Sequence, residues 1–288
     1  MASADTISHG LAAPVHSGGF GDEVRTAAMI WQRELIRFAR TRTRILTSLI
    51  QPILFLFVMG YGMSPLVGSV AGFDFKKFVF PGVVAMSVVS TAIFSAISIV
   101  WDREFGFLRE MLVAPVSRAS LVLGKTAGGA SVATVQGTIM LALAPVIGVH
   151  VTLMMIIEVI GCELLMAIAL TSFGVFIASR IQKIESFQVV MQLLLLPMLF
   201  LSGALFPLSG LPVWLSAITR INPLTYAVDP LRHVVFAVQN MPAAAAARFP
   251  VGIELFGKIL PIGVELGVVV VFAAVFLGIA IQSFGRPE

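Results

Sequence analysis

Charged residues are scarce in this sequence. Only 12% of its 288 residues are Asp, Glu, Lys or Arg, and 58% are hydrophobic, whereas an ordinary soluble domain contains about 25% charged and roughly 45–50% apolar residues. A soluble fold cannot hide such an excess of apolar side chains. We therefore expect an all-α integral membrane protein, because a helix of about 20 apolar residues crosses the bilayer core.

Cysteine and histidine are also rare. The single cysteine, Cys162, lies inside an apolar run, so it can form neither an intrachain disulfide nor a cysteine metal cluster. We interpret His150 and His233 as having no Cys, Asp or Glu at ligand spacing, and the 13 methionines are scattered without the pairing of a copper site. The sequence thus predicts no catalytic residues and no metal or cofactor bound by this chain.

A nucleotide-binding motif is missing as well. A phosphate-binding P-loop requires the pattern GxxxxGK[ST], but the only GKT, at residues 124–126, has Ala119 where the first glycine is needed. This GKT also opens an apolar run. We therefore expect the chain to have no ATPase activity of its own.

Six apolar runs are long enough to cross a bilayer. Around them, residues 1–21 are predicted to be a disordered leader without a signal peptide, because they contain no sustained apolar core. Residues 283–288 are predicted to be a short tail. The predicted spans are residues 45–63, 80–100, 126–149, 151–179, 187–206 and 259–282.

Basic residues predict how these spans are oriented. Of the 19 Lys and Arg residues, 13 lie before the first span, between the second and third, after the fourth, or in the tail. Short cytoplasmic loops carry the excess of Lys and Arg. Both termini are therefore expected in the cytoplasm of a bacterial cell, with the protein in its cytoplasmic membrane.

Residues 22–44 have an amphipathic helical pattern. Trp31, Leu35 and Phe38 share one helical face, while Arg33, Arg37, Arg40 and Arg44 lie opposite and Arg42 falls on the wrong side. This pattern is typical of a helix lying in the membrane interface. A helix that packs on its own protein is the alternative.

A charged segment follows the second span. On a continuous helix, Trp101, Phe105, Leu108 and Leu112 would share one face. Gly106 on the polar face is unusual, because glycine in a helix costs about 1 kcal/mol relative to alanine. Either a partner approaches the backbone closely there, or the glycine separates two short helices; both interpretations remain open.

Prolines interrupt the segment between the fifth and sixth spans, so neither half of it forms a full crossing. Asp229 followed by Pro230 matches a helix cap and first-turn proline, which predicts a short helix over residues 230–238. A second short helix is predicted over residues 212–220.

Three carboxylates lie within the apolar runs: Glu158, Glu163 and Glu265. Because charges in a membrane are costly, such residues are functional candidates. They could pair with Lys258 or His150, line a path for a cationic or polar cargo, or accept protons. The last possibility supports an alternative function, that of a proton- or ion-coupled secondary transporter.

Three motifs resemble those of one transporter family. They are WDREFGFLREMLVAPVSR at residues 101–118, LSGALFPLSGLP at 201–212 and NPLTYAVDPLR at 222–232. Together they resemble the permeases of type-2 ATP-binding-cassette exporters, especially the daunorubicin-resistance and nodulation-factor export branch. The resemblance extends over roughly residues 31–282.

This resemblance implies a permease that exports a hydrophobic or amphiphilic drug, lipid or glycolipid, and so a role in antibiotic resistance or lipid export. It implies a homodimer or heterodimer of permeases with separate nucleotide-binding subunits that hold ATP and magnesium. No nucleic-acid partner is expected, because the basic residues flank the apolar runs instead of forming a patch. Residues 22–44 would be a connecting helix, about 101–115 a coupling helix and about 207–238 outer helices.

Site residues follow from the same resemblance. The ATPase-coupling residues would be Asp102, Arg103, Glu104, Phe105, Gly106, Arg109 and Glu110. The outer gate would include Pro207, Asn222, Pro223, Tyr226, Asp229 and Arg232.

Overall fold

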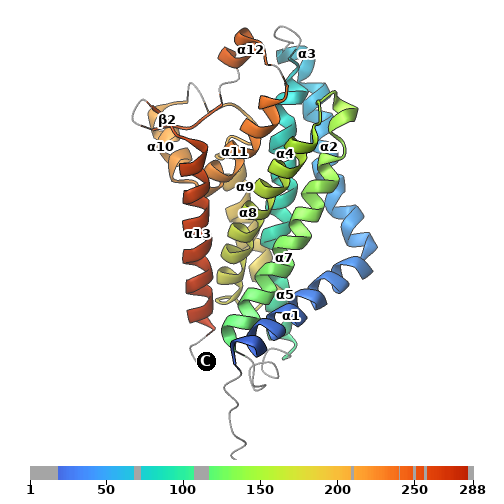
Figure 1. Cartoon of the computed structure of the whole chain (residues 1–288), viewed down its shortest axis with the longest axis vertical. Coiled ribbons are helices and arrows are strands. Elements are labelled where there is room, and N and C mark those ends of the chain that lie inside the picture. Colours follow the sequence, from blue (N-terminus) through green and yellow to red (C-terminus); the bar gives the residue numbers. More distant parts are fainter. Residues whose placement is uncertain are drawn as a thin grey trace, which may run out of the picture.

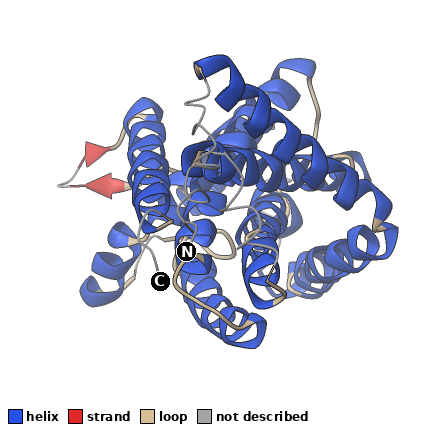
Figure 2. Cartoon of the chain, turned by 90° about the horizontal axis from the view of Figure 1, so that it is seen from below, coloured by secondary structure: helices blue, strands red, loops and turns tan. Residues whose placement is uncertain are grey.

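The protein is almost entirely helical (Figure 1). A computed structural model describes residues 19–67, 73–106, 117–208, 211–239, 241–248, 251–255 and 258–284. Within these ranges the strands are β1 (Glu254–Leu255) and β2 (Lys258–Ile259), which pair antiparallel at the periphery of the bundle (Figure 2). The prediction of an all-α integral membrane protein is confirmed.

Within the described part of the chain, each predicted apolar run overlaps an apolar helix, and five of these helices are long. The described residues include five helices long and apolar enough to cross a membrane, and α9 (Ile184–Phe200) is apolar but shorter. The five are Ile45–Gly62 within α2 (Arg42–Gly62), α4 (Phe75–Ser95) continued by α5 (Ile97–Glu104), α7 (Arg118–Leu141) continued by the 3-10 helix η1 (Ala144–Ile147), α8 (Leu153–Ala178) and α13 (Ile262–Ser283).

The α9 helix is shorter than the run predicted from the sequence, which extended to residue 206. It ends at Phe200, and Gly203 follows in a left-handed conformation with φ of 76°. Glycine adopts this conformation without a steric penalty. This turn ends α9 and leads into the proline-containing segment that holds α10 and α11.

Helix α4 forms the centre of the bundle. It packs against α2, α7 and α8, and Phe78, Phe80, Val83 and Val88 along it are fully buried. Burial of each such side chain contributes about 1.5–3 kcal/mol in a soluble protein. Inside a bilayer much of this contribution comes from packing instead, because lipid tails are as apolar as these side chains.

The two ends of the bundle differ in content. Helix α1 (Phe20–Arg40), helix α5 and the last turn of α13 lie at one end in Figure 1, whereas α3 (Ser64–Val67), α12 (Ala243–Arg248) and the strands lie at the other. Residues 101–106 therefore lie at the same end as the last described residues of the chain. We call this the inner end.

Of the two short helices predicted near the opposite end, one begins close to where the sequence suggested and the other does not. Helix α10 (Val213–Ile221) follows the prediction closely, but α11 (Pro223–Ala237) does not start at Pro230, which lies inside it. Asn222 caps α11, its side-chain oxygen accepting the Leu224 backbone N–H at 3.1 Å. The predicted start of this helix at Pro230 was therefore wrong. Asn222 and Pro223 carry the same cap-and-proline signature as Asp229 and Pro230, and the helix begins at the earlier pair.

Candidate functional site

A cavity of about 520 Å³ opens between α1, α2, α4, α5, α7 and α9. Its lining combines amide and hydroxyl groups with apolar side chains. The polar ones include Ser48, Gln51, Ser90, Thr91, Ser95, Ser98, Gln136, Gln188 and Gln192, and the apolar ones include Phe38, Met86, Phe94, Val132, Leu195, Leu196 and Leu199.

Gln136 orders the polar side of this cavity. Its amide nitrogen donates to the Ser48 hydroxyl at 2.7 Å, and its amide oxygen accepts the Thr91 hydroxyl at 2.8 Å. One side chain of α7 therefore connects α2 to α4. A surface that offers both hydrogen bonds and apolar contact suits a molecule that is itself part polar and part apolar.

Glu34 and Lys125, which line the cavity, belong to a cluster of four charged residues. The Lys125 amine lies 2.7 Å from Asp102 and 2.9 Å from Glu34, and it donates to the Ser98 hydroxyl at 3.0 Å. Arg33 lies 3.3 Å from Glu34 and 3.5 Å from Asp102. We call Arg33, Glu34, Asp102 and Lys125 the inner junction, because they tie α1, α5 and α7 together.

The charges of the inner junction are balanced, and three of its four side chains are largely shielded from water, whereas 44% of the Arg33 side chain is exposed. Only 3% of the Lys125 side chain is exposed, with 12% of Glu34 and 13% of Asp102. Burial alone would raise the pKa of the Glu34 carboxyl, but the attraction and hydrogen bond of Lys125 lower the pKa below its usual value of 4.5. Glu34 is therefore held as a carboxylate beside its cation.

Small residues bring α1 close to α7. A Cβ on Gly128 would lie 2.7 Å from the Cβ of Glu34, and one on Gly124 would lie 2.7 Å from the Ala27 carbonyl oxygen. The Trp31 indole N–H also donates to the Ser131 hydroxyl at 3.0 Å. Figure 1 shows α1 crossing the inner half of α7. Helix α1 thus packs on its own protein, the alternative left open by its amphipathic pattern.

The first helix also has other bounds than predicted. It runs from Phe20 to Arg40 and stops at Thr41, so the predicted helix over residues 22–44 was too long. Arg42 and Arg44 belong to the first turn of α2, and their side chains lie outside the described part. The role of α1 as a connecting helix stays a prediction.

The charged segment is not one continuous helix. Helix α5 ends at Glu104, and Gly106 has a left-handed φ of 82°. A shared face running from Trp101 through Leu108 to Leu112 was therefore wrong, and Gly106 breaks the helix. Leu108, Arg109, Glu110 and Leu112 lie outside the described residues.

The described part of this segment is anchored to the α8–α9 turn. The Arg103 guanidinium donates to the carbonyls of Ala178, Ser179 and Ile181 at 3.3, 3.1 and 3.0 Å. The Glu104 carboxylate accepts the Ile184 backbone N–H at 2.9 Å, at the start of α9. Phe105 stays exposed. A displacement of α5 would therefore act on α9 as well as on the inner junction.

The three carboxylates predicted in the spans lie apart from one another. Glu158 is exposed on α8. Glu163 is fully buried, accepts the Thr138 hydroxyl at 3.4 Å and packs against Gly137, where a Cβ would lie 2.7 Å from its carboxyl group. Glu265 is buried in the first turn of α13. None of them is among the described residues that line the cavity.

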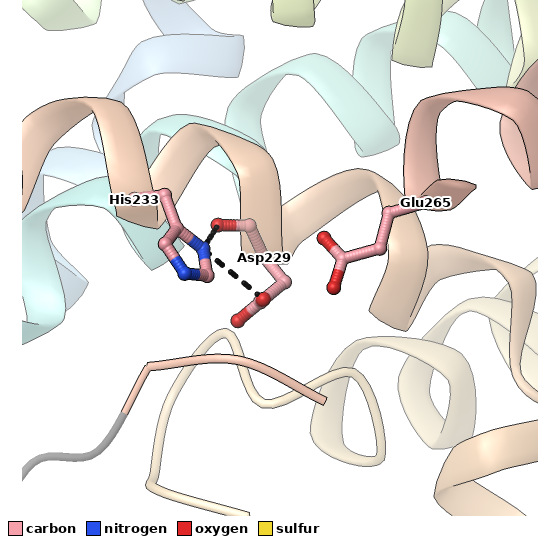
Figure 3. Close-up of side chains that lie close together, drawn as sticks. All are labelled: Asp229, His233 and Glu265. Atoms are coloured by element: carbon pink, nitrogen blue, oxygen red, sulfur yellow. Dashed lines mark hydrogen bonds and ion pairs between the residues drawn. The ribbon is translucent and has the colours of Figure 1, made fainter. Parts of the chain in front are cut away.

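Glu265 contributes to a second cluster, which the sequence did not reveal. Asp229, His233 and Glu265 each place one potential ligand atom within 4.8 Å of the others (Figure 3). The interpretation of His233 as lacking an acidic neighbour was wrong, since Asp229 lies one helical turn before it. We call these three residues the outer cluster.

The pairing partners predicted for the carboxylates were His150 and Lys258. His150 is instead hydrogen-bonded through its backbone to Gln239, and the Lys258 side chain lies outside the described part.

The other predicted gate residues hold α11 in place. The Asn222 amide donates to the Met198 carbonyl at 2.7 Å, and the Tyr226 hydroxyl donates to the Arg220 carbonyl at 2.7 Å. Arg232 donates to the Gly203 carbonyl and lies over the Phe78 ring, 4.5 Å from its centroid. Pro207 and Pro223 flank this region. Whether these residues form a gate stays a prediction.

Comparison with known proteins identifies the family. The sequence model of the ABC-2 type transporter family matches residues 26–236. Similar proteins include nodulation protein J of Rhizobium meliloti (strain 1021), 30% identical over 72% of this chain and 79% of the relative. The putative transport permease ycf38 of Cyanophora paradoxa is 29% identical over 70% and 71%, respectively. The inner membrane transport permease YadH of Escherichia coli K12 is 24% identical over 74% and 84%.

The family match begins within α1, ends within α11 and includes the two motifs beyond α9. The predicted type-2 resemblance is confirmed. This chain belongs to the ABC-2 type transporter family and is a permease subunit of an ATP-binding-cassette transporter in the cytoplasmic membrane.

Proposed function

We propose that this permease exports a hydrophobic or amphiphilic molecule, such as a drug, lipid or glycolipid, with energy from ATP hydrolysed by a separate subunit. The cavity carries this proposal, because its lining offers amide and hydroxyl groups beside apolar side chains. A purely apolar cargo would offer no hydrogen bonds to the Gln188 and Gln192 amides of the lining, and a small ion would not need the apolar wall. The working unit would contain a second permease copy or a homologous permease, with both termini in the cytoplasm.

Coupling to the ATPase would use the segment that begins with α5. Asp102 binds Lys125 of α7, while Arg103 and Glu104 hold the α8–α9 turn. A push on residues beyond Gly106 would therefore reach both sides of the cavity through polar contacts rather than through a flexible loop. Such coupling requires each ATPase state to favour one permease state.

Cargo recognition can be tested by altering the polar wall. Gln136→Leu and Gln192→Leu remove amides from the cavity, whereas Gln282→Leu changes an exposed amide at the end of α13 and serves as the control. In vesicles containing the permease and its ATPase subunit, we expect ATP-dependent transport of an amphiphilic dye to change at least about tenfold for the cavity variants only. Equal transport by all three variants would overturn the assignment of this cavity.

Coupling can be tested separately at Arg109 and Glu110. Replacing either with alanine should lower ATP-dependent transport and weaken copurification of the ATPase subunit, while membrane insertion stays normal. Arg118→Ala, a change of a basic residue at the first position of α7, is the control. Unaltered ATPase binding by every variant between Arg103 and Glu110 would contradict the coupling role.

A further inference from the structure

The outer cluster brings together groups from distant parts of the chain. Asp229 and His233 lie one turn apart on α11, and Glu265 comes from the first turn of α13. One His233 ring nitrogen, Nδ1, lies 3.2 Å from Oδ2 of Asp229 and 3.1 Å from its backbone carbonyl. In Figure 3 the Glu265 carboxylate extends toward Asp229 from the opposite side.

Glu265 lacks the partners that a buried carboxylate needs. Its exposure is 0%, and neither of its oxygens makes a hydrogen bond of normal geometry among the described residues, although the Asp229 carboxyl and the Ile253 backbone lie beside it. An isolated buried carboxylate is strongly unfavourable unless it is paired, neutralised or bound to a metal. The orphaned carboxylate faces a second carboxylate and an imidazole, a combination that favours a cation between them.

Among the described side chains near Glu265, the other cation points elsewhere. Arg232 of α11 is directed to the Gly203 carbonyl and the Phe78 ring. The Gly252 backbone N–H donates to Oδ1 of Asp229 at 3.2 Å, which orients this carboxylate but leaves Glu265 without a hydrogen bond. Gly252, with φ of 109°, brings the loop close to the His233 ring.

We propose that the outer cluster binds a divalent transition-metal cation of the zinc class, through one oxygen each of Asp229 and Glu265 and one imidazole nitrogen of His233. Imidazole with carboxylate ligands is a donor set that zinc accepts, with water in a further position. Ligand atoms around zinc lie roughly 3.5 Å apart. The atoms here lie within 4.8 Å of one another, so binding would require the three side chains to approach by about 1 Å.

A bound cation would link α11 to α13 directly. Helix α11 already packs on α13, α8 and α4, and the metal would add bonds between two segments that are otherwise joined by the loop containing β1 and β2. This proposal does not depend on which molecule is transported. It departs from the expectation, drawn from the sequence, that the chain binds no metal.

Metal binding is tested with the purified full-length permease in lipid nanodiscs, first treated with a chelator. Equilibrium dialysis against ZnCl₂ with elemental analysis should find about one tightly bound zinc per chain. His233→Gln and Glu265→Gln should weaken this binding at least about tenfold. The matched controls are His150→Gln and Glu158→Gln, which change an exposed histidine and an exposed carboxylate outside the cluster.

A second measurement uses the unmodified protein, so it does not depend on the variants folding. Diethyl pyrocarbonate should modify His233, whose side chain is 26% exposed, and zinc should protect it while His150 on the same chain stays reactive. Peptide mass spectrometry reads both sites. Absence of zinc binding by the wild type, equal binding by the cluster and control variants, or unprotected His233 would overturn the proposal.

Discussion

The inner junction and the outer cluster each gather buried charged groups from separate helices, but they differ in charge balance. The inner junction pairs two cations with two carboxylates, and Lys125 contacts both carboxylates within 3 Å. The outer cluster sets two carboxylates against one imidazole, and both oxygens of Glu265 lack a partner among the described residues. The difference in charge balance is the basis for treating the inner junction as a structural joint and the outer cluster as the proposed cation site.

The largest expected effect is at Lys125. Lys125→Met removes the buried cation shared by Glu34 and Asp102 and leaves them only the half-exposed Arg33, and removal of one partner of a buried ion pair costs about 3–5 kcal/mol. Chemical unfolding in detergent should show this loss of unfolding free energy. Lys183→Met, which changes an exposed lysine before α9, should alter the unfolding free energy by less than about 0.5 kcal/mol. Similar losses of unfolding free energy in Lys125→Met and Lys183→Met would show that the inner junction does not stabilise the fold.

Packing and charge at the inner junction can be separated at Gly128. In Gly128→Ala the new Cβ would lie 2.7 Å from the Cβ of Glu34, and such overpacking costs about 1–3 kcal/mol. The control is Gly161→Ala on α8, where a Cβ meets nothing within 4 Å. We expect thermal unfolding to move down for Gly128→Ala and to stay or rise for the control. A stable Gly128→Ala variant would show that α1 is not closely held on α7.

A smaller effect is expected from pH. Because Lys125 lowers the pKa of Glu34 below its ordinary value of 4.5, the ionised carboxylate stabilises the fold above that pH. The contribution is lost as the pH falls through the lower, folded-state pKa. The Tm difference between wild type and Glu34→Gln should therefore be largest above pH 4.5 and shrink below it. A difference independent of pH would contradict the ion pair.

The smallest effect has the opposite sign. In chelator-treated protein, Glu265→Gln removes a carboxylate that has no described partner, so the unfolding free energy should stay unchanged or rise by up to about 1 kcal/mol. The same amide substitution at Glu34 should lower it. Differential scanning calorimetry of both variants gives the comparison. A marked loss for Glu265→Gln would show that Glu265 is already satisfied in the metal-free protein.

The membrane class followed directly from the sequence, because the preference of an apolar run for the bilayer depends on local composition. The two clusters depend on long-range packing. Lys125 follows a glycine at the start of an apolar run, and nothing local shows that Glu34 and Asp102 converge on it. Glu265 meets Asp229 only because the chain returns to α11.

Some signals were present in the sequence and were misinterpreted. Asp229 and His233 have the spacing of one helical turn, which places them on one face once α11 is known to include both. The predicted helix began at Pro230 and so left Asp229 outside it, because the cap-and-proline signature at Asp229 and Pro230 indicated a start there. At Gly106 the sequence left two interpretations open, a close approach by a partner or a break between helices, and the structure shows the break, because α5 ends at Glu104 and Gly106 has a left-handed φ.

The burial of α11 limits how the protein could open at the end opposite the inner junction. Its residues Leu224, Val228, Leu231 and Val235 are almost inaccessible to solvent, wedged among α4, α8 and α13. Helix α11 cannot move alone, because it packs against α4, α8 and α13 at once. Any opening at this end would therefore require these helices to rearrange together.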